Sequence, residues 1–530
     1  MNLQPNSSAR FAQTTLTVAC LVILVLYGLM IDLKGISTDE GIRLAIINGG
    51  QTFTQGMPVI SPTWAMVLKA GNPYAYQPLY YLMQNTLMRA AQTHDVIFFR
   101  LVNLFFLWVA LQGLLSLSKT WRLLPRLFLL GIFAFNAYLF MHVLQIREYI
   151  VGVAFYIWST WLVLRLIARP LERSWSDVAW FVAYGILLTL GFFVQSWVVF
   201  PAFGQFLFLV ARRADQRPRF YVHLALSYAI VLSAVWLYLP SHQQRVDVGR
   251  WGGSGTELWP QLSMGFHLVL SGHLPGEYRF TDFLFWFWLA VIAGGGLLLL
   301  GKKFRAATGT KYTEFKSQFL LMFLCSVISL AFQIGYFVKM DSNLPVWPRY
   351  FVIHYFFLTW LAAATFNYLY EFRASSSGSR WLRRSLTAGI AVIAAVALTS
   401  GVFQTISYYK NPLLDTGLSR ESNWFTTTSE LARIIEPNDL LVTYDFICRT
   451  NLTFTRPIPN RVILLPEIET TDLKSVPRVV YLESISVLSQ RGDLVARMSA
   501  VGFKTMREFR IHAADGNSLV TDWRFLAFTR

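Results

Sequence analysis

The feature that most constrains this chain is a series of apolar segments, each near twenty residues long, that recurs along most of its length. A helix of about twenty residues crosses the roughly 30 Å hydrocarbon core of a bilayer with every backbone hydrogen bond made internally. The composition agrees, because 55% of the 530 residues are hydrophobic and only 14% are charged. The sequence therefore predicts an α-helical polytopic membrane protein. We place eleven crossings at residues 11–31, 97–117, 127–142, 149–168, 177–194, 198–211, 220–239, 283–301, 317–338, 350–370 and 385–405.

Many of the Lys and Arg residues behind the formal net charge of +17 lie in short connections between these segments. With the N-terminus inside, the inner connections collect most of those cations, whereas the short outer loops hold only Arg147, Lys339 and Arg349. This asymmetry is the positive-inside pattern, so the charge does not indicate nucleic-acid binding. The first segment is too long for a signal peptide and lacks a cleavage site, which predicts a retained anchor. We expect an integral membrane protein.

The segment Pro78–Ala91 is predicted to lie along the outer surface as an amphipathic helix instead of crossing the membrane. Gln84, Asn85 and Arg89 interrupt its apolar pattern, and one more crossing here would reverse the sidedness of every later basic connection. The residues expected to meet lipid or protein are Tyr80, Tyr81, Leu82 and Leu87. Three outer loops, at 32–96, 142–148 and 240–282, then share one side of the membrane.

The chain changes character after residue 408, where short β-branched runs alternate with polar residues. We predict a transmembrane domain over 1–408 and a small soluble α/β domain over 409–530, on the outer side if there are eleven crossings. The expected strands are 439–444, 461–465 and 478–482, with helices at 428–435 and 487–501. A terminal hairpin is expected from 505–512 and 519–529, joined through Asp515-Gly516-Asn517.

Two adjacent carboxylates, Asp39 and Glu40, follow the first crossing at the outer membrane surface. In unlike environments, one such carboxylate can act as a general base while the other positions a substrate or a cation. A second interpretation is that Thr38 or Asp39 only caps a helix over 41–47. The local sequence leaves both interpretations open.

The order of several short motifs carries a family resemblance. These motifs are Thr38-Asp39-Glu40, Gln77-Pro78-Leu79-Tyr80-Tyr81, Phe99-Arg100-Leu101, Gln145-Ile146-Arg147-Glu148-Tyr149 and Trp347-Pro348-Arg349-Tyr350. Over residues 1–405 the chain resembles the membrane-embedded GT-C glycosyltransferases of the protein mannosyltransferase and aminoarabinose transferase type. Gln77 and Val102 stand where that family commonly has proline, so the match is one of pattern.

The resemblance implies an enzyme that moves a hexosyl or pentosyl unit, with inversion, from a polyprenyl phosphate to an acceptor on the outer face. The acceptor class, whether lipid, glycan or protein, stays open. Asp39 would be the general base, and Glu40 would hold the acceptor or Asp39. If Asp39 is not the base, Glu40 or Glu148 is the alternative. Residues expected to bind the donor phosphate are Arg147 first, then Arg349, Arg245 and Arg250. Residues expected to contact the substrates are Tyr80, Tyr81, Tyr149, Trp251, Tyr350 and His242.

Plainer interpretations of these residues stand beside the functional ones. Arg147 and Glu148 also suit a simple ion pair at the mouth of a helix, and Arg349 suits an interfacial anchor. His242, His267 and His273 have no flanking cysteine and no metal-site spacing, so no metal ligand set is predicted. The carboxylate pair itself leaves a requirement for a divalent cation open.

Two other protein classes compete with the glycosyltransferase. A secondary transporter would place ionisable residues near mid-helix and show two matching halves with broken helices, and the sequence shows neither pattern. A non-catalytic membrane subunit of polysaccharide assembly remains open, because in it Asp39 and Glu40 would only cap a helix.

Overall fold

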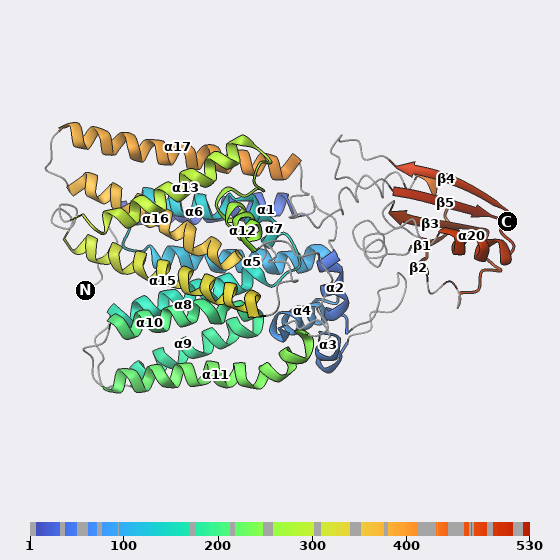
Figure 1. The fold of residues 1–530 in the computed structure, drawn as a ribbon, viewed down its shortest axis with the longest axis horizontal. Helices are drawn as coiled ribbons and strands as arrows, with labels where there is room; N and C mark the ends of the chain where they lie inside the picture. Colours follow the sequence, from blue (N-terminus) through green and yellow to red (C-terminus); the bar gives the residue numbers. More distant parts are fainter. Residues whose placement is uncertain are drawn as a thin grey trace. The chain divides into compact units, whose positions relative to one another are not determined.

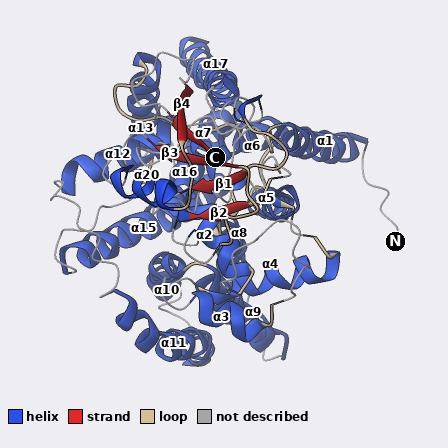
Figure 2. Cartoon of the chain, turned by 90° about the vertical axis from the view of Figure 1, so that its right-hand side faces the viewer, coloured by secondary structure: helices blue, strands red, loops and turns tan. Residues whose placement is uncertain are grey.

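The computed structural model of the chain describes residues 7–31, 38–49, 62–71, 77–93, 95–168, 175–212, 218–246, 258–301, 309–339, 351–375, 380–410, 431, 433–443, 460–465, 468, 471–484, 491–511 and 523–530. The chain forms two compact units. One comprises residues 1–29, 72–80 and 102–410, and the other comprises residues 30–71, 81–101 and 411–530. The described part of the first unit is helical, and the described strands form one sheet in the second unit (Figures 1 and 2).

The first unit is a helical bundle. Its helices are α1 (Ser7–Leu29), α6 (Leu123–Ala134), α7 (Ala137–Val143), α8 (Tyr149–Ala168), α9 (Trp175–Val194), η2 (Ser196–Val198), α10 (Val199–Arg212), α11 (Pro218–Val246), α12 (Leu258–Ser271), α13 (Arg279–Leu298), α15 (Thr310–Lys339), α16 (Val352–Ser375) and α17 (Arg380–Lys410). Helix α16 is the most buried of the long apolar helices and packs on α15, α13 and α6. Two further helices, α4 (Pro78–Ala91) and α5 (Val96–Leu117), run from one unit into the other.

The prediction of a polytopic membrane protein is confirmed. Within the described residues, eight helices are long and apolar enough to cross a bilayer, and the bent pair α6 and α7 counts as a ninth. The predicted segments 177–194 and 198–211 fall on the shorter apolar helices Val178–Val194 and Ser196–Arg212. Each predicted crossing thus coincides with an apolar helix, while the total of eleven stays a prediction.

The crossing expected at 127–142 is not one straight helix. It breaks after Ala134, and α7 leaves α6 at an angle of 68°. A break frees backbone groups that must find other partners inside a membrane. On the α7 side, Asn136 accepts a hydrogen bond from the backbone N–H of Tyr138 (2.9 Å), and Gln404 Oε1 of α17 accepts from that of Ala137 (2.8 Å).

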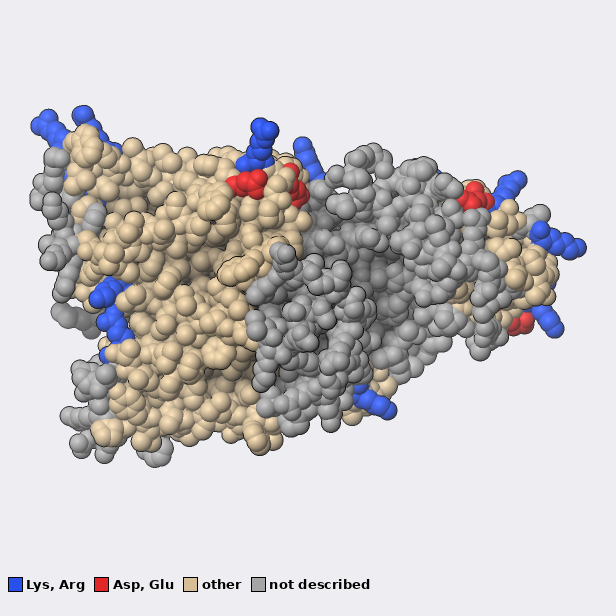
Figure 3. All heavy atoms as spheres, in the orientation of Figure 1, with Lys and Arg blue, Asp and Glu red and all other residues tan. Residues whose placement is uncertain are grey.

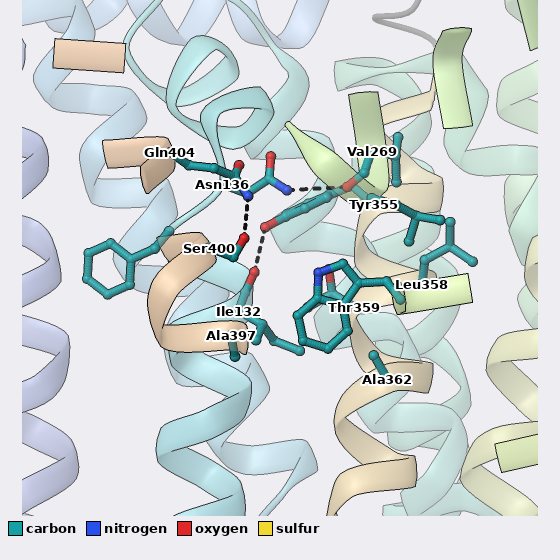
Figure 4. A pocket seen from close by; sticks show the side chains of 13 residues that line it. Ile132, Asn136, Val269, Tyr355, Leu358, Thr359, Ala362, Ala397, Ser400 and Gln404 are labelled. Atoms are coloured by element: carbon teal, nitrogen blue, oxygen red, sulfur yellow. Dashed lines mark hydrogen bonds between the residues drawn. The ribbon is translucent and has the colours of Figure 1, made fainter. Parts of the chain in front are cut away.

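The carbonyls at the end of α6 are also satisfied by side chains from distant helices. The Tyr355 hydroxyl donates to the carbonyls of Ile132 (3.0 Å) and Phe133, and the Tyr27 hydroxyl donates to that of Ala134 (2.7 Å). Figure 4 shows Tyr355, Asn136 and Gln404 converging on a cavity of about 30 Å³, room for about one water molecule. The break is therefore stabilised by side chains of α1, α16 and α17.

The second unit contains α2 (Thr38–Ile47), α3 (Trp64–Gly71) and a five-stranded sheet. The strands are β1 (Leu440–Thr443), β2 (Val462–Leu464), β3 (Arg478–Ser484), β4 (Thr505–Ile511) and β5 (Trp523–Thr529), in the order β2-β1-β3-β5-β4. β1 pairs in parallel with β2 and β3, and β5 pairs antiparallel with β3 and β4. The predicted small α/β tail and its terminal hairpin are thus confirmed, while Asp515-Gly516-Asn517 lies outside the described residues.

Helix α20 (Arg491–Ala500) covers one face of the sheet. Its Leu494 and Met498 are buried against alternate strand residues such as Val442 and Tyr481, as the two-residue period of a strand requires. The bundle ends at Lys410 and the first strand begins at Leu440, so the predicted domain boundary at 408/409 falls near the end of α17 and stays a prediction.

Candidate active site

Helix α2 carries the two adjacent carboxylates that follow α1. The helix begins at Thr38, earlier than the 41–47 expected from the capping interpretation, so Asp39 and Glu40 lie in its first turn. The positive end of the helix dipole favours negative charge at this position. The side chain of Glu40 is fully buried, whereas that of Asp39 lies outside the described part of the structure.

Glu40 forms a buried ion pair with Arg100 in the first turns of α5. The Nε and Nη2 atoms of Arg100 donate to Glu40 Oε1 at 3.3 and 3.2 Å, and Nη1 donates to the carbonyl of Ile31 at 2.9 Å. The side chains of Arg100 and Glu40 are only 1% and 0% exposed. Two buried charges are tolerated in such a place because they compensate each other and because further hydrogen bonds satisfy the guanidinium.

The sequence interpretation missed Arg100 as a site residue. The Phe99-Arg100-Leu101 motif contributes to the family resemblance, but no role is predicted from it for Arg100. A usable indication was present, because a charged residue just inside an apolar crossing is costly unless a partner or a function retains it. Glu40 was expected to hold the acceptor or Asp39, and its described partner is Arg100.

Helix α4 forms with the bounds predicted for the amphipathic segment, and its amides support this region. Asn85 Nδ2 donates to the carbonyl of Ile47 at the end of α2 (2.9 Å), and Gln84 Nε2 donates to that of Phe99 (3.4 Å). Both amide side chains are fully buried. The polar residues that interrupt the apolar pattern therefore hold neighbouring backbone in place.

A second polar cluster lies in the helical bundle, around the loop between α7 and α8. Asn103 of α5 is fully buried, and its Nδ2 donates to the carbonyls of Gln145 and of Arg147, the latter at 3.1 Å. Its Oδ1 accepts from the Tyr80 hydroxyl at 3.1 Å. One asparagine thus fixes the backbone on both sides of Ile146 and places Arg147 at the start of α8.

The side chains of this loop are buried despite their polarity. Arg147 and Glu148 have almost no exposed surface. The ring of His142 lies edge-on between Tyr138 and Tyr149, with ring centroids 4.5 and 4.8 Å away.

Gln145 is also buried in this loop, and neither of its side-chain amide atoms has a hydrogen-bond partner among the described residues. A buried amide in that state costs on the order of 1–3 kcal/mol, so the position suits a polar ligand.

Two histidines in residues 240–282, His267 and His273, have partners of their own. His267 Nε2 lies 2.9 Å from Asp282 Oδ1, and its Nδ1 lies 2.8 Å from the Ser271 hydroxyl. His273 Nε2 lies 3.0 Å from Ser407 of α17. Among the described residues, no group of three or more His, Cys, Asp or Glu side chains is arranged to hold a metal ion.

Several predicted site residues fall outside the description. Arg250, Trp251, Arg349 and Tyr350 are in segments that are not described, and His242 and Arg245 belong to α11 by backbone alone. Tyr80, Tyr81 and Tyr149 are buried side chains. The roles assigned to all these residues, and the expected approach of Asp39 to Arg147, stay predictions.

No family model and no curated protein match this chain. Solved structures similar to it include ArnT from Cupriavidus metallidurans bound to undecaprenyl phosphate, with 11% identity, a TM-score of 0.49 and coverage of 96% of this chain and 97% of that one.

Two further similar structures are transferases by name. The oligosaccharyltransferase AglB from Archaeoglobus fulgidus, in complex with an inhibitory peptide and a dolichol-phosphate, has 11% identity, a TM-score of 0.46 and coverage of 89% and 69% of the two chains. The arabinofuranosyltransferase AftD from Mycobacteria has 13% identity, a TM-score of 0.46 and coverage of 98% and 40%. At such identities the chemistry must be argued from this chain's own side chains.

Proposed function

We propose that this chain is a glycosyltransferase that moves a sugar from a polyprenyl-phosphate donor to an acceptor at the outer surface of a bacterial inner membrane. The observation that carries the proposal is the buried Glu40–Arg100 ion pair in the first turn of α2. It commits the Glu40 carboxylate to a buried pairing with Arg100. In this proposal the adjacent Asp39 takes the other task, since neighbouring carboxyls in unlike surroundings can divide the roles of base and positioning group.

In this proposal Glu40 is a positioning residue. Its pairing with Arg100 ties the start of α2 to α5, and the bond from Arg100 to Ile31 ties both to the end of the first crossing. A general base acts well only when its position is fixed within hydrogen-bond reach of the proton it removes. Asp39, the residue before Glu40, would be that base and would deprotonate the acceptor as the sugar is displaced with inversion.

The leaving group of the proposed reaction is a polyprenyl phosphate, which gains negative charge as the glycosidic bond breaks. A guanidinium suits this charge because it does not lose its proton at physiological pH and binds phosphate oxygens in pairs. Arg147 is the first choice, since Asn103 holds its backbone and the loop is buried. Gln145 would offer its amide to the donor.

The proposal for the base is tested with Asp39→Asn in the full-length protein. Turnover should fall about 10²- to 10⁴-fold, the usual contribution of a general base, while binding of the lipid donor stays nearly unchanged. Sugar transfer in membranes and donor binding to purified protein are measured side by side. The matched control is Asp95→Asn, an exposed carboxylate that caps α5 and keeps a capping oxygen after the change.

Full transfer activity in Asp39→Asn would refute the role of Asp39 and make Glu148 the candidate base. A non-catalytic subunit would also tolerate this change. An enzyme with a different base should still lose activity in a variant of Glu40 or Glu148. A non-catalytic subunit should tolerate substitution of Asp39, Glu40 and Glu148 alike.

The phosphate role is tested with Arg147→Ala. Loss of a charge-assisted contact costs about 1.5–3 kcal/mol, so the donor should bind roughly tenfold or more weakly, and turnover should fall further. Arg89→Ala, which removes an exposed arginine on α4, serves as the control. Equal donor affinity in wild type and Arg147→Ala would transfer the assignment to Arg349.

A further inference from the structure

A basic groove lies between the end of α16 and the start of α17. Its volume is about 600 Å³, within the range of ordinary ligand pockets. The residues of this basic groove that matter here are Arg373, Arg383, Arg384, Thr387, Ala388 and Ala391. Figure 3 shows Lys and Arg side chains at the end of the bundle where α17 begins.

The basic groove lies far from the candidate site of the bundle. Arg383 precedes Gln404 by 21 residues of one continuous helix, which is about 30 Å. Gln404 contacts the first residue of α7, and α7 leads into the loop that carries Arg147. That separation equals roughly one hydrocarbon thickness, so the groove opens at the opposite membrane surface from the bend.

The walls of the basic groove are joined by side chains. The Nε atom of Arg373 on α16 donates to the Thr387 hydroxyl on α17 at 2.8 Å, and that hydroxyl donates to the carbonyl of Arg383 at 2.7 Å. Glu371, two residues before Arg373 on α16, is buried and paired with Arg122 at 3.1 Å. Its carboxylate therefore pairs with an arginine that is not part of the groove lining.

The neighbouring residues place the basic groove at the level of lipid headgroups. Trp381, at the start of α17, is 74% exposed, and exposed tryptophans are typical of the membrane interface. Ala388 and Ala391 follow on the exposed surface of the helix, about two and three turns beyond Trp381. The groove thus combines a cationic rim with an apolar floor formed by small side chains.

We propose that the basic groove binds the headgroup phosphate of an anionic membrane phospholipid. Three guanidinium groups around one opening suit a phosphodiester, and basic pockets between membrane helices commonly take anionic lipids. An acyl chain would lie along Ala388 and Ala391, where small side chains leave room. The apolar floor favours a lipid over a free phosphate ion, and this site is independent of the proposed sugar transfer.

The test uses purified full-length protein and native mass spectrometry with phosphatidylglycerol or phosphatidylcholine added. Wild type should retain phosphatidylglycerol preferentially. The double variant Arg383→Gln with Arg384→Gln should weaken that binding at least tenfold, as expected for loss of contacts to a charged group. Lys119→Gln with Arg380→Gln, which removes the same charge from outside the groove lining, should change it less than twofold.

A second variant probes the apolar floor. Ala391→Trp leaves every cation in place but fills the path of an acyl chain, and it should also weaken phosphatidylglycerol binding. Equal loss in the Lys119/Arg380 control would overturn the proposal in favour of diffuse surface charge. Full binding in Ala391→Trp, or displacement of the lipid by millimolar inorganic phosphate, would mean that the groove holds a phosphate ion and no lipid.

Discussion

Two arginine–carboxylate pairs in this protein share the same chemistry but differ in their access to water. Arg100 and Glu40 join two helices, and their side chains are 1% and 0% exposed. Arg478 of β3 binds Asp439 through Nε at 2.9 Å and Nη2 at 2.7 Å, yet it is 15% exposed and also reaches Glu436, which is 69% exposed. Water does not reach Arg100 or Glu40, whereas Arg478 is partly exposed and one of its two carboxylate partners, Glu436, is exposed to water.

The loss of folding free energy on breaking such a pair depends on whether water can reach the charge that remains. A charge left alone in a dry interior loses both its partner and its hydration, so removing one member costs much more than the pair itself contributed. A charge that water can reach recovers much of its hydration. Removing one member of the Glu40–Arg100 pair should therefore destabilise the fold more than removing one carboxylate from Arg478.

The largest effect is expected for Arg100→Met, which leaves the Glu40 carboxylate buried without its guanidinium. We expect a loss of about 3–5 kcal/mol, measured by denaturant unfolding in detergent. Arg89→Met, at an exposed position of α4, is the control and should be nearly neutral.

Adding Glu40→Gln to Arg100→Met sharpens the comparison. The double variant should recover much of the lost stability, because no uncompensated charge then remains in the interior. Two strictly additive losses would show that the pair is not coupled and would remove the argument for Glu40 as a positioning residue.

A smaller effect is expected in the sheet domain. Asp439→Ala removes both hydrogen bonds to Arg478 and should cost about 1–3 kcal/mol, whereas Glu436→Ala should cost about 1 kcal/mol or less. Hydrogen exchange of the β1 and β3 amides in the full-length protein measures both changes. Equal effects of the two substitutions would contradict the distinction between buried and exposed partners.

Arg478 should add no pH dependence near neutrality. Its hydrogen bonds to the Asp439 carboxylate raise the pKa of Arg478 above its ordinary value, against the opposing effect of burial. A raised pKa stabilises the fold at every pH below the unfolded value, and this contribution is lost only as the pH rises through the folded value. The pH window in which Arg478 affects stability therefore lies far above neutrality.

Local patterns were sufficient for many elements of this fold. The bounds of α4 agree with the amphipathic pattern of Pro78–Ala91, and the terminal hairpin pairs Thr505 with Thr529 as its alternation indicates. Such elements depend on residues a few positions apart, so a period of two or of 3.6 residues identifies them. The carboxylates of the candidate site were also visible, because two adjacent acidic residues follow an apolar crossing in a chain with only 29 Asp and Glu residues.

The sequence by itself determined the class of this protein, since long apolar runs leave only membrane helices as a solution. The tertiary structure decided which polar groups meet. Arg100 finds Glu40 across 60 residues, and Gln404 accepts from Ala137 across 267 residues, which explains why the helix break was missed. No local period encodes such partners, because each depends on how distant helices pack to satisfy buried polar groups.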